Sequence, residues 1–452
     1  MDAGLPDAAL PDAALPPHPP RPNPPSADTL EQPAGFQWAR GLIHMHSVHS
    51  HDACDGDPKP DGQPNAPCLA DLRAAVCSSR LDFMLLTDHP ESFAEVSFEE
   101  ATLHDPTAGD TLLRAPEAEG GGVVGNALAC ADGRPVLIAP GSEGDLMPVM
   151  LKSPPADPTW YRARAPESVE ALRAAGALVL HAHTEERTFE ELWPLGLDGF
   201  ELYNLHANVN PRWQQLPEVL PDLTRLLQSG AGGPHPDLAL LALLRENRWA
   251  LDTYDRFIAR RRTLGVAGSD IHQNLPPALF RTSDGERLDS YRRLTRWFAN
   301  YLLVRERSLD GVREALVAGR AYAVFHLLGE PEGVDVSLTD AQGARHELGA
   351  EVGFTEGLTL TFTPPRPPAG ATLHARLLRA RALGEPGGDP ANTERVTVAE
   401  GAGALSFAVD TPGAYRVEVW ITPEHLRAEL GSLADLLVRP TPWIYSNPIY
   451  VR

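Results

Sequence analysis

The sequence lacks an apolar run long enough to cross a bilayer, and it is poor in positive charge. Its longer apolar runs, such as Leu238–Leu244, fall well short of the ~18 residues that a membrane-spanning helix needs. Its 39 Lys and Arg residues are outnumbered by 61 Asp and Glu, which gives a net charge of −22. Because a field of this sign repels polyanions, we expect no nucleic-acid partner.

Regular folding signals are also lacking at the N-terminus. Residues 5–16 read LPDAALPDAALP, and ten prolines fall within the first 33 residues. Proline donates no backbone hydrogen bond and the segment has little apolar surface to bury, so we predict a disordered tail over residues 1–35. No basic segment followed by an apolar stretch begins at Met1. The tail is therefore interpreted either as the stalk of a periplasmic, secreted or cell-surface lipoprotein whose signal was removed, or as a cytoplasmic tail. Membrane contact is expected only through such a lost lipid anchor.

Cysteine is scarce, with four residues in the chain. Cys54 and Cys68 bracket a Pro-, Gly- and Asp-rich loop that has almost no apolar side chains. A disulfide closing this loop would stabilise the fold by ~3 kcal/mol in the chain-entropy model. We predict that disulfide, which favours an oxidising compartment; the alternative is four unrelated buried thiols.

Strand-like and helix-like segments alternate from residue 37 to about 325. The apolar runs end at Ile43, Leu86, Ala139, Leu180, Leu202 and Ala267. The helix-like stretches are Cys68–Ser79, Pro166–Ala175, Asp237–Asn247 and Leu288–Tyr301. This alternation predicts an α/β domain at residues 36–328, with a parallel sheet or barrel.

The pattern of apolar and polar residues changes beyond residue 328. Short alternating runs are separated there by Gly and Pro, at Val334–Leu338, Leu358–Phe362, Leu373–Arg379, Val396–Ala399, Leu405–Val409 and Tyr415–Trp420. This pattern is typical of a β-sandwich, so we predict an accessory β domain at residues 329–452. The region contains few histidines or paired carboxylates, and we expect no chemistry in it.

In five places a buried run of the first domain ends in residues that bind metal. These ends are His44–His46, Asp88–His89, Glu143, His181–His183 and Asp270–His272. The carboxyl ends of the strands of a parallel α/β barrel converge on one face. Residues i and i+2 of an extended segment point the same way, so each H-x-H or D-x-H pair can reach one ion. A lone histidine beside a strand is usually an ordinary polar residue, but the whole set predicts a metal site.

These motifs carry a family resemblance. HMHSVHSHD, TDH, GSE, AHT, ELYN and GSDIH, in this order, resemble the PHP (polymerase and histidinol phosphatase) domain family. The later RERSLDGVREALVAGRAYAVF, the β region and the closing WIYSNPIYV resemble its CehA/McbA-type hydrolases. The resemblance covers residues 38–452. It implies a distorted (β/α)7 barrel followed by a C-terminal β-sandwich, with up to three divalent ions, commonly Zn, Mn or Fe.

The resemblance also implies ligand sets. A first ion would take His44, His46, Glu143 and Asp270. A second would take His89, His272 and the residue at the SHD step, for which we expect His51 with Asp52 as the alternate. A third would share Glu143 and use His183, whereas His181 has no counterpart and is expected to be structural or an alternate ligand. Asp88, His89 and Asp270 are the expected catalytic residues.

One departure from the family pattern bears on the third ion. Many relatives have a further histidine soon after the glutamate of the GxE motif, but no histidine lies between Glu143 and His181. We therefore expect one or two divalent ions, with a third as an additional candidate. Lys152 is interpreted either as a positive charge near the metals or as an exposed surface lysine. Arg212 and Arg281 are candidate phosphate clamps, with surface arginines as the alternative.

These features predict a metal-dependent hydrolase. Phosphoester hydrolysis of a small-molecule phosphate ester by metal-activated water is the first hypothesis. The alternatives are a carbamate, ester or amide hydrolase of the CehA/McbA type and a non-catalytic surface-binding protein. Substrate identity does not follow from any motif in the loops.

Overall fold

The computed structural model describes residues 21–205, 234–276, 282, 284–383 and 392–452. The part of the predicted tail that it describes is ordered, which corrects the expectation for residues 21–35. Ala27 and Leu30 are buried, and the Arg40 guanidinium donates to the Pro25 carbonyl at 2.8 Å. The segment packs because its few apolar side chains and backbone carbonyls have partners on the body of the protein.

The first part of the chain is α/β, as predicted. Its central strands run in the order β8-β9-β1-β2-β5 and are parallel, with antiparallel β4 and β3 beyond β5. The strands of this region are β1 (Gln37–Met45), β2 (Phe83–Leu86), β3 (Thr111–Arg114), β4 (Val123–Ala129), β5 (Pro135–Ala139), β6 (Met147–Val149), β7 (Leu178–Leu180), β8 (Gly199–Asn204), β9 (Leu264–Ile271), β10 (Ala299–Val304) and β11 (Ala321–Val324). The central parallel strands are buried almost throughout, as their continuous apolar runs require.

The strand pairings do not close a (β/α)7 barrel. In the described part of the chain, β6 and β7 form a separate antiparallel pair. Backbone hydrogen bonds link this pair to its neighbours, including those from Leu151 N to the Pro140 carbonyl at 3.0 Å and from His181 N to the Gly199 carbonyl at 3.2 Å. These contacts do not extend into full ladders, so the described strands do not form a closed barrel.

Two helices follow the sequence closely and two expectations were wrong. The α-helices are α1 (Ala66–Ser78), α2 (Pro90–Phe93), α3 (Phe98–Ala101), α4 (Pro166–Ala174), α5 (Phe189–Leu192), α8 (Arg248–Ile258), α9 (Tyr291–Leu294), α10 (Leu309–Ala318), α11 (Arg427–Leu430) and α12 (Ala434–Leu437). The stretch 237–247 is mostly a 3₁₀ helix, η10 (Pro236–Leu243), and the α-helix begins only after Asn247, whose side chain caps Ala250 N at 3.4 Å. The stretch 288–301 divides into α9 and β10, since its last residues pair with β1 and β11.

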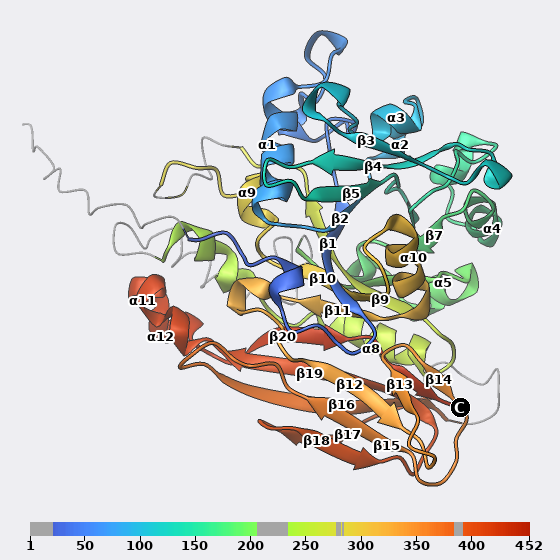
Figure 1. Cartoon of the computed structure of the whole chain (residues 1–452), viewed down its shortest axis with the longest axis vertical. Coiled ribbons are helices and arrows are strands. Elements are labelled where there is room, and N and C mark those ends of the chain that lie inside the picture. The colour runs from blue at the N-terminus through green and yellow to red at the C-terminus, as the bar shows by residue number, and fades with distance from the viewer. Residues whose placement is uncertain (1–20, 206–233, 277–281, 283, 384–391) are drawn as a thin grey trace, which may run out of the picture.

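The β region contains all six predicted strands, but it is not a free-standing sandwich. Its strands are β12 (Asp335–Thr339), β13 (Arg345–Glu347), β14 (Glu351–Val352), β15 (Thr359–Thr363), β16 (Thr372–Ala382), β17 (Thr393–Gly401), β18 (Leu405–Ala408), β19 (Gly413–Thr422), β20 (Thr441–Ser446) and β21 (Ile449–Val451). One sheet has the order β13-β12-β15-β18. The other is continuous with the first region, because β20 pairs with β11 and β11 with β10. Figure 1 shows these orange and red strands gathered at one end of the molecule.

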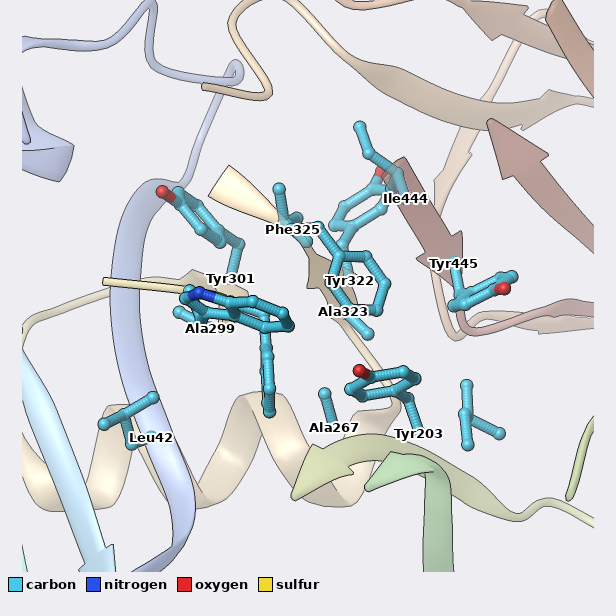
Figure 2. Close-up of a cluster of buried hydrophobic side chains, with 14 of the residues drawn as sticks. Leu42, Tyr203, Ala267, Ala299, Tyr301, Tyr322, Ala323, Phe325, Ile444 and Tyr445 are labelled. Carbon is cyan, nitrogen blue, oxygen red and sulfur yellow. The ribbon is translucent and has the colours of Figure 1, made fainter. Parts of the chain in front are cut away.

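An apolar cluster joins the two regions across this continuous sheet (Figure 2). Aromatic rings dominate it: the Tyr203 and Phe325 rings are 4.7 Å apart and perpendicular, and those of Trp38 and Tyr322 are 5.7 Å apart. Other members are Leu42, Ala267, Ala299, Tyr301, Ala323, Ile444 and Tyr445. The shared core makes the two regions one packed unit.

Two disulfides are present. Cys54 is bonded to Cys68, as predicted, and Cys77 is bonded to Cys130, which the sequence reasoning did not pair. The alternative of four separate thiols is therefore wrong. Among the described residues, none of the helices combines the length and apolarity that crossing a membrane would need.

Candidate metal centre

Imidazoles and carboxylates meet where the parallel strands end. His44 and His46 close β1, His89 and Glu143 follow β2 and β5, and Asp270 closes β9. Two groups of four have ligand atoms within 4.8 Å of one another, and each group could hold a metal ion. These groups are His44, Glu143, His183 and Asp270, and His46, Asp52, His89 and His272.

Several of these side chains stand on strained backbone. His44, His183 and Asp270 have φ values of 66°, 49° and 50°, in the left-handed region that residues other than glycine seldom adopt. The kink at His44 shifts the register of β1 against both neighbouring strands. Each such residue costs on the order of 1–3 kcal/mol, and such strain gathers at functional sites. The kinks turn the ligand atoms toward a common centre.

The four residues expected to hold the first ion are brought together. Glu143 Oε2 is 3.2 Å from both His44 Nε2 and His46 Nε2. Asp270 Oδ1 is 3.1 Å from His44 Nε2 and 3.5 Å from His46 Nε2. Two imidazole nitrogens and two carboxylate oxygens thus surround one position, a donor set that suits Zn²⁺ and related ions.

At the second position Asp52, and not His51, lies near the other ligands, which reverses the expected preference between these two residues. Asp52 Oδ2 lies 3.3 Å from His272 Nε2 and 3.5 Å from His89 Nε2. His51 is exposed, belongs to neither group, and approaches only with its ring centroid 5.2 Å from that of His89. The reason is the loop after β1, which pairs with the end of β9 through Cys54 N and the His272 carbonyl at 3.0 Å.

The third expected position gains a donor from Asp270. His183 Nε2 is 2.9 Å from Glu143 Oε1 and 3.7 Å from Asp270 Oδ2. Glu143 and Asp270 therefore each present one oxygen to His44 and the other to His183. Carboxylates with this arrangement can bridge two cations.

The electrostatics of the centre call for positive charge. Burial raises the pKa of the Glu143 and Asp270 carboxyls, but the surrounding histidines outweigh it and hold both well below the usual range. Burial lowers the pKa of His183, but Glu143 and Glu185 outweigh it and raise that pKa to about 11. The two carboxylates thus stay charged out of water, which requires either protonated histidines or a metal ion beside them.

Four buried ligand atoms have no hydrogen-bond partner. They are His44 Nε2, His46 Nε2, His272 Nε2 and Asp270 Oδ1. An unsatisfied buried polar atom costs about 1–3 kcal/mol, so four at one place need an explanation. Divalent cations at the two positions would take these atoms as ligands, and the residues fit such ions.

Other predicted site residues lie elsewhere or act differently. The Asp88 carboxylate accepts from Ser47 N at 2.6 Å and from the Ser47 hydroxyl at 2.8 Å, so it anchors the loop after β1 rather than facing the ligand groups. His181 Nδ1 is 3.2 Å from the Asp145 carbonyl, outside both groups, and burial lowers its pKa to about 4.

Nor does the structure bring the predicted substrate cations to the centre. Lys152 Nζ pairs with Glu119 at 2.8 Å on the surface, which agrees with the exposed-lysine interpretation. Arg212 and Arg281 lie outside the described residues.

A buried pair on β8 was missed by the site prediction. Glu201 and Asn204, from the ELYN motif, lie behind the ligands, and Glu201 Oε1 is 2.5 Å from His44 Nδ1. A carboxylate inside a fully buried strand is itself a signal, because a buried charge requires a partner.

The centre opens into a cavity of about 350 Å³. Its described lining includes Asp52, His89, Glu143, His183, Leu205, Asp270, His272, Gln273, Asn274, Leu275, Asp289 and Leu294. Three leucines contribute apolar surface to the lining, and the described lining carries neither Lys nor Arg.

Comparisons with known proteins leave the family open. No family model matches the chain, and no curated protein matches it. Among solved structures, a two-domain protein from Bacteroides vulgatus, described as containing a predicted PHP-like metal-dependent phosphoesterase, is 15% identical, with a TM-score of 0.33 over 95% of this chain and 99% of that one. The soluble domain of PmoD from a Methylocystis species is 16% identical, with a TM-score of 0.16 over 26% of this chain and 90% of that one. Neither likeness is strong enough to assign a family or a function.

Proposed function

We propose that this protein is a divalent-metal-dependent hydrolase and that phosphate esters are its first substrate class. The observation that carries the proposal is the shared use of Glu143 and Asp270 by histidines on both sides, together with four buried ligand atoms that have no hydrogen-bond partner. Asp270 and His272, which carry two of these atoms, also line the cavity.

The chemistry follows from the positions of the residues. Divalent ions held there would polarise the scissile group and lower the pKa of water. Glu143 and Asp270 would each offer one oxygen to either of two neighbouring ions. Asp52, His89 and His272 lie at the cavity, where a substrate would meet the centre. We propose one or two ions of Zn, Mn or Fe, and a third through Glu143, His183 and the second oxygen of Asp270.

One observation favours carbonyl substrates as the second candidate. Leu205, Leu275 and Leu294 line the cavity, and the part of the lining that is described offers neither lysine nor arginine for a phosphate. An apolar wall suits the leaving group of an aryl carbamate, ester or amide, the activity of CehA/McbA-type hydrolases. The resemblance to that subgroup and an exported location, supported by two disulfides, are parts of the same proposal.

Elemental analysis of the purified protein and a substrate screen test this function. We expect one or two tightly held equivalents of Zn, Mn or Fe. Hydrolysis of phosphomonoesters or phosphodiesters should fall on chelation and return with Mn²⁺ or Zn²⁺. Cleavage of aryl carbamates alone would favour the second candidate. Protein that binds none of these ions, or whose activity ignores chelation, would contradict both.

A further inference from the structure

Glu201 is a buried carboxylate that touches two ligand-bearing strand ends at once. It is 1% exposed and lies on β8, within a strand that is buried throughout. Its Oε1 is 2.5 Å from His44 Nδ1. Its Oε2 accepts from the backbone N–H of His183 at 2.9 Å and from Asn204 Nδ2 at 2.7 Å. Both oxygens are therefore fully used.

The contact with His44 decides which ring nitrogen is free. A carboxylate at Nδ1 keeps the proton on that nitrogen, so the lone pair of a neutral imidazole is on Nε2. Nε2 is the atom that faces Glu143 and Asp270 and has no hydrogen-bond partner. The orientation is the one that a metal ligand needs, and such outer carboxylates also make the imidazole a better donor.

The hydrogen bond between Glu201 and the His183 N–H stabilises a strained backbone conformation. His183 has a φ of 49°, and its N–H would lose a buried acceptor if Glu201 were absent. His44 is strained in the same sense, with a φ of 66°. The carboxylate of Glu201 on β8 thus contacts both His44, near the end of β1, and His183, just beyond β7, and both residues have left-handed backbone conformations.

Gly268 on β9 leaves the space that the Glu201 carboxylate occupies. A Cβ atom at Gly268 would lie 1.6 Å from Glu201 Oε1 and 2.3 Å from its Cδ. The φ of Gly268 is not in the left-handed region, so space and not backbone conformation requires glycine there. The first residue of the GSDIH motif therefore makes room for Glu201, two residues before Asp270.

We propose that Glu201 is a positioning residue that orients His44 and His183 toward the metal centre, and that Gly268 is glycine to admit it. The inference rests on the proposed metal function. It assigns to the ELYN and GSDIH motifs a joint task that involves no direct contact between Glu201 and a metal ion.

Metal affinity measures this role without relying on activity. Titration of metal-free protein with Zn²⁺ or Mn²⁺ by calorimetry should show affinity reduced by about 10–100-fold in Glu201→Ala, the range for loss of an outer hydrogen-bond partner. The metal affinity of Glu201→Gln should lie between those of the wild type and Glu201→Ala. Its amide oxygen still accepts from His44, whereas its NH₂ cannot accept from His183 N. Glu418→Gln is the matched control, since Glu418 is also buried on a strand and paired, with Arg416 at 2.7 Å, but lies in the β region.

A stability cycle in metal-free protein tests the contact itself. Gly268→Ala should lower the melting temperature in the wild-type background and lower it much less in Glu201→Ala, because the clash requires the carboxylate. Equal losses in both backgrounds would overturn the role of Gly268. If Glu201→Ala does not fold, the calorimetry of Glu201→Gln decides the proposal.

The failures of the two proposals are distinguishable. Unchanged metal affinity in Glu201→Gln and Glu201→Ala, with binding lost in a His44→Ala/His46→Ala double variant, would overturn the positioning role and leave the metal centre standing. An affinity loss in Glu418→Gln as large as that at Glu201 would also overturn it. Metal binding retained by the double variant would instead overturn the proposed function.

Discussion

The metal centre and the β region treat buried charge in different ways. In the β region, the Arg416 guanidinium is 1% exposed and is paired with Asp255 on α8 and with Glu418, each at 2.7 Å. At the metal centre, carboxylates and imidazoles crowd one point with ligand atoms left unpaired. Paired charges serve the packing of the fold, whereas several ligand atoms without a hydrogen bond at one place indicate a bound group.

Backbone strain divides in the same way. Ten residues other than glycine have positive φ, and in the described part of the chain all of them precede residue 274. Three of these are the proposed ligands His44, His183 and Asp270, and a fourth, Gln273, lines the cavity. In the described part of the β region no residue other than glycine has a positive φ, so this strain lies in the region that carries the candidate chemistry.

The largest expected effect is at the ligands. The His44→Ala/His46→Ala double variant should lose activity and bound metal but remain folded, because the surrounding core is apolar and does not depend on these rings. Metal analysis and circular dichroism measure both. His374→Ala, on the exposed face of β16, is the control and should change neither quantity. A double variant with normal metal content would show that the histidines at this centre do not hold a metal ion.

Adjacent residues give the next prediction. Asp52→Asn should weaken metal binding by about tenfold or more, about 1.4 kcal/mol, since it removes a carboxylate near His89 and His272. His51→Ala should leave the affinity nearly unchanged, because that side chain is exposed. Calorimetric titration of the two variants compares them directly. A larger loss at His51 would restore the original order of the two candidates.

At the buried ion pair between α8 and the β region, a charge change should affect stability alone. Asp255→Asn leaves Arg416 short of a buried partner and should lower the free energy of unfolding by about 3–5 kcal/mol, with metal content unchanged. Asp252→Asn, on the exposed side of the same helix, is the control and should cost little. Urea unfolding measures both. A fall in metal affinity at Asp255 would mean that the two regions are coupled.

The smallest effect is expected at Lys152. Its ion pair with Glu119 is exposed, and such pairs contribute about 0–1 kcal/mol. Lys152→Met should therefore leave both stability and kcat/KM nearly unchanged. A large rise in KM for an anionic substrate would show that this lysine does act at the centre.

Much of the fold and of the centre could be predicted because local pattern encodes it. The ends of β2 and β5 were predicted from apolar runs that stop at polar residues, whereas β1 and β9 continue to Met45 and Ile271, beyond the predicted run ends. The six β-region strands were predicted from alternation between Gly and Pro. The predicted helix boundaries were wrong where a capping residue sets the start of a helix. Asn247 caps the start of α8, whereas the sequence pattern predicts that it ends a helix. The prediction of disorder failed for residues 21–35 because their partners, such as Arg40, are supplied by the body of the protein.

The sequence by itself determined which residue types arrive at the strand ends: His44, Glu143 and Asp270 follow buried runs, and their chemistry predicts a metal. Tertiary structure alone decided that Asp52 and not its neighbour His51 reaches the second position, because the loop after β1 is held against the end of β9. It also decided that Glu201 meets His44 and needs the space left by Gly268. Periodicity reports how one segment is buried, whereas these choices depend on contacts between segments that are distant along the chain.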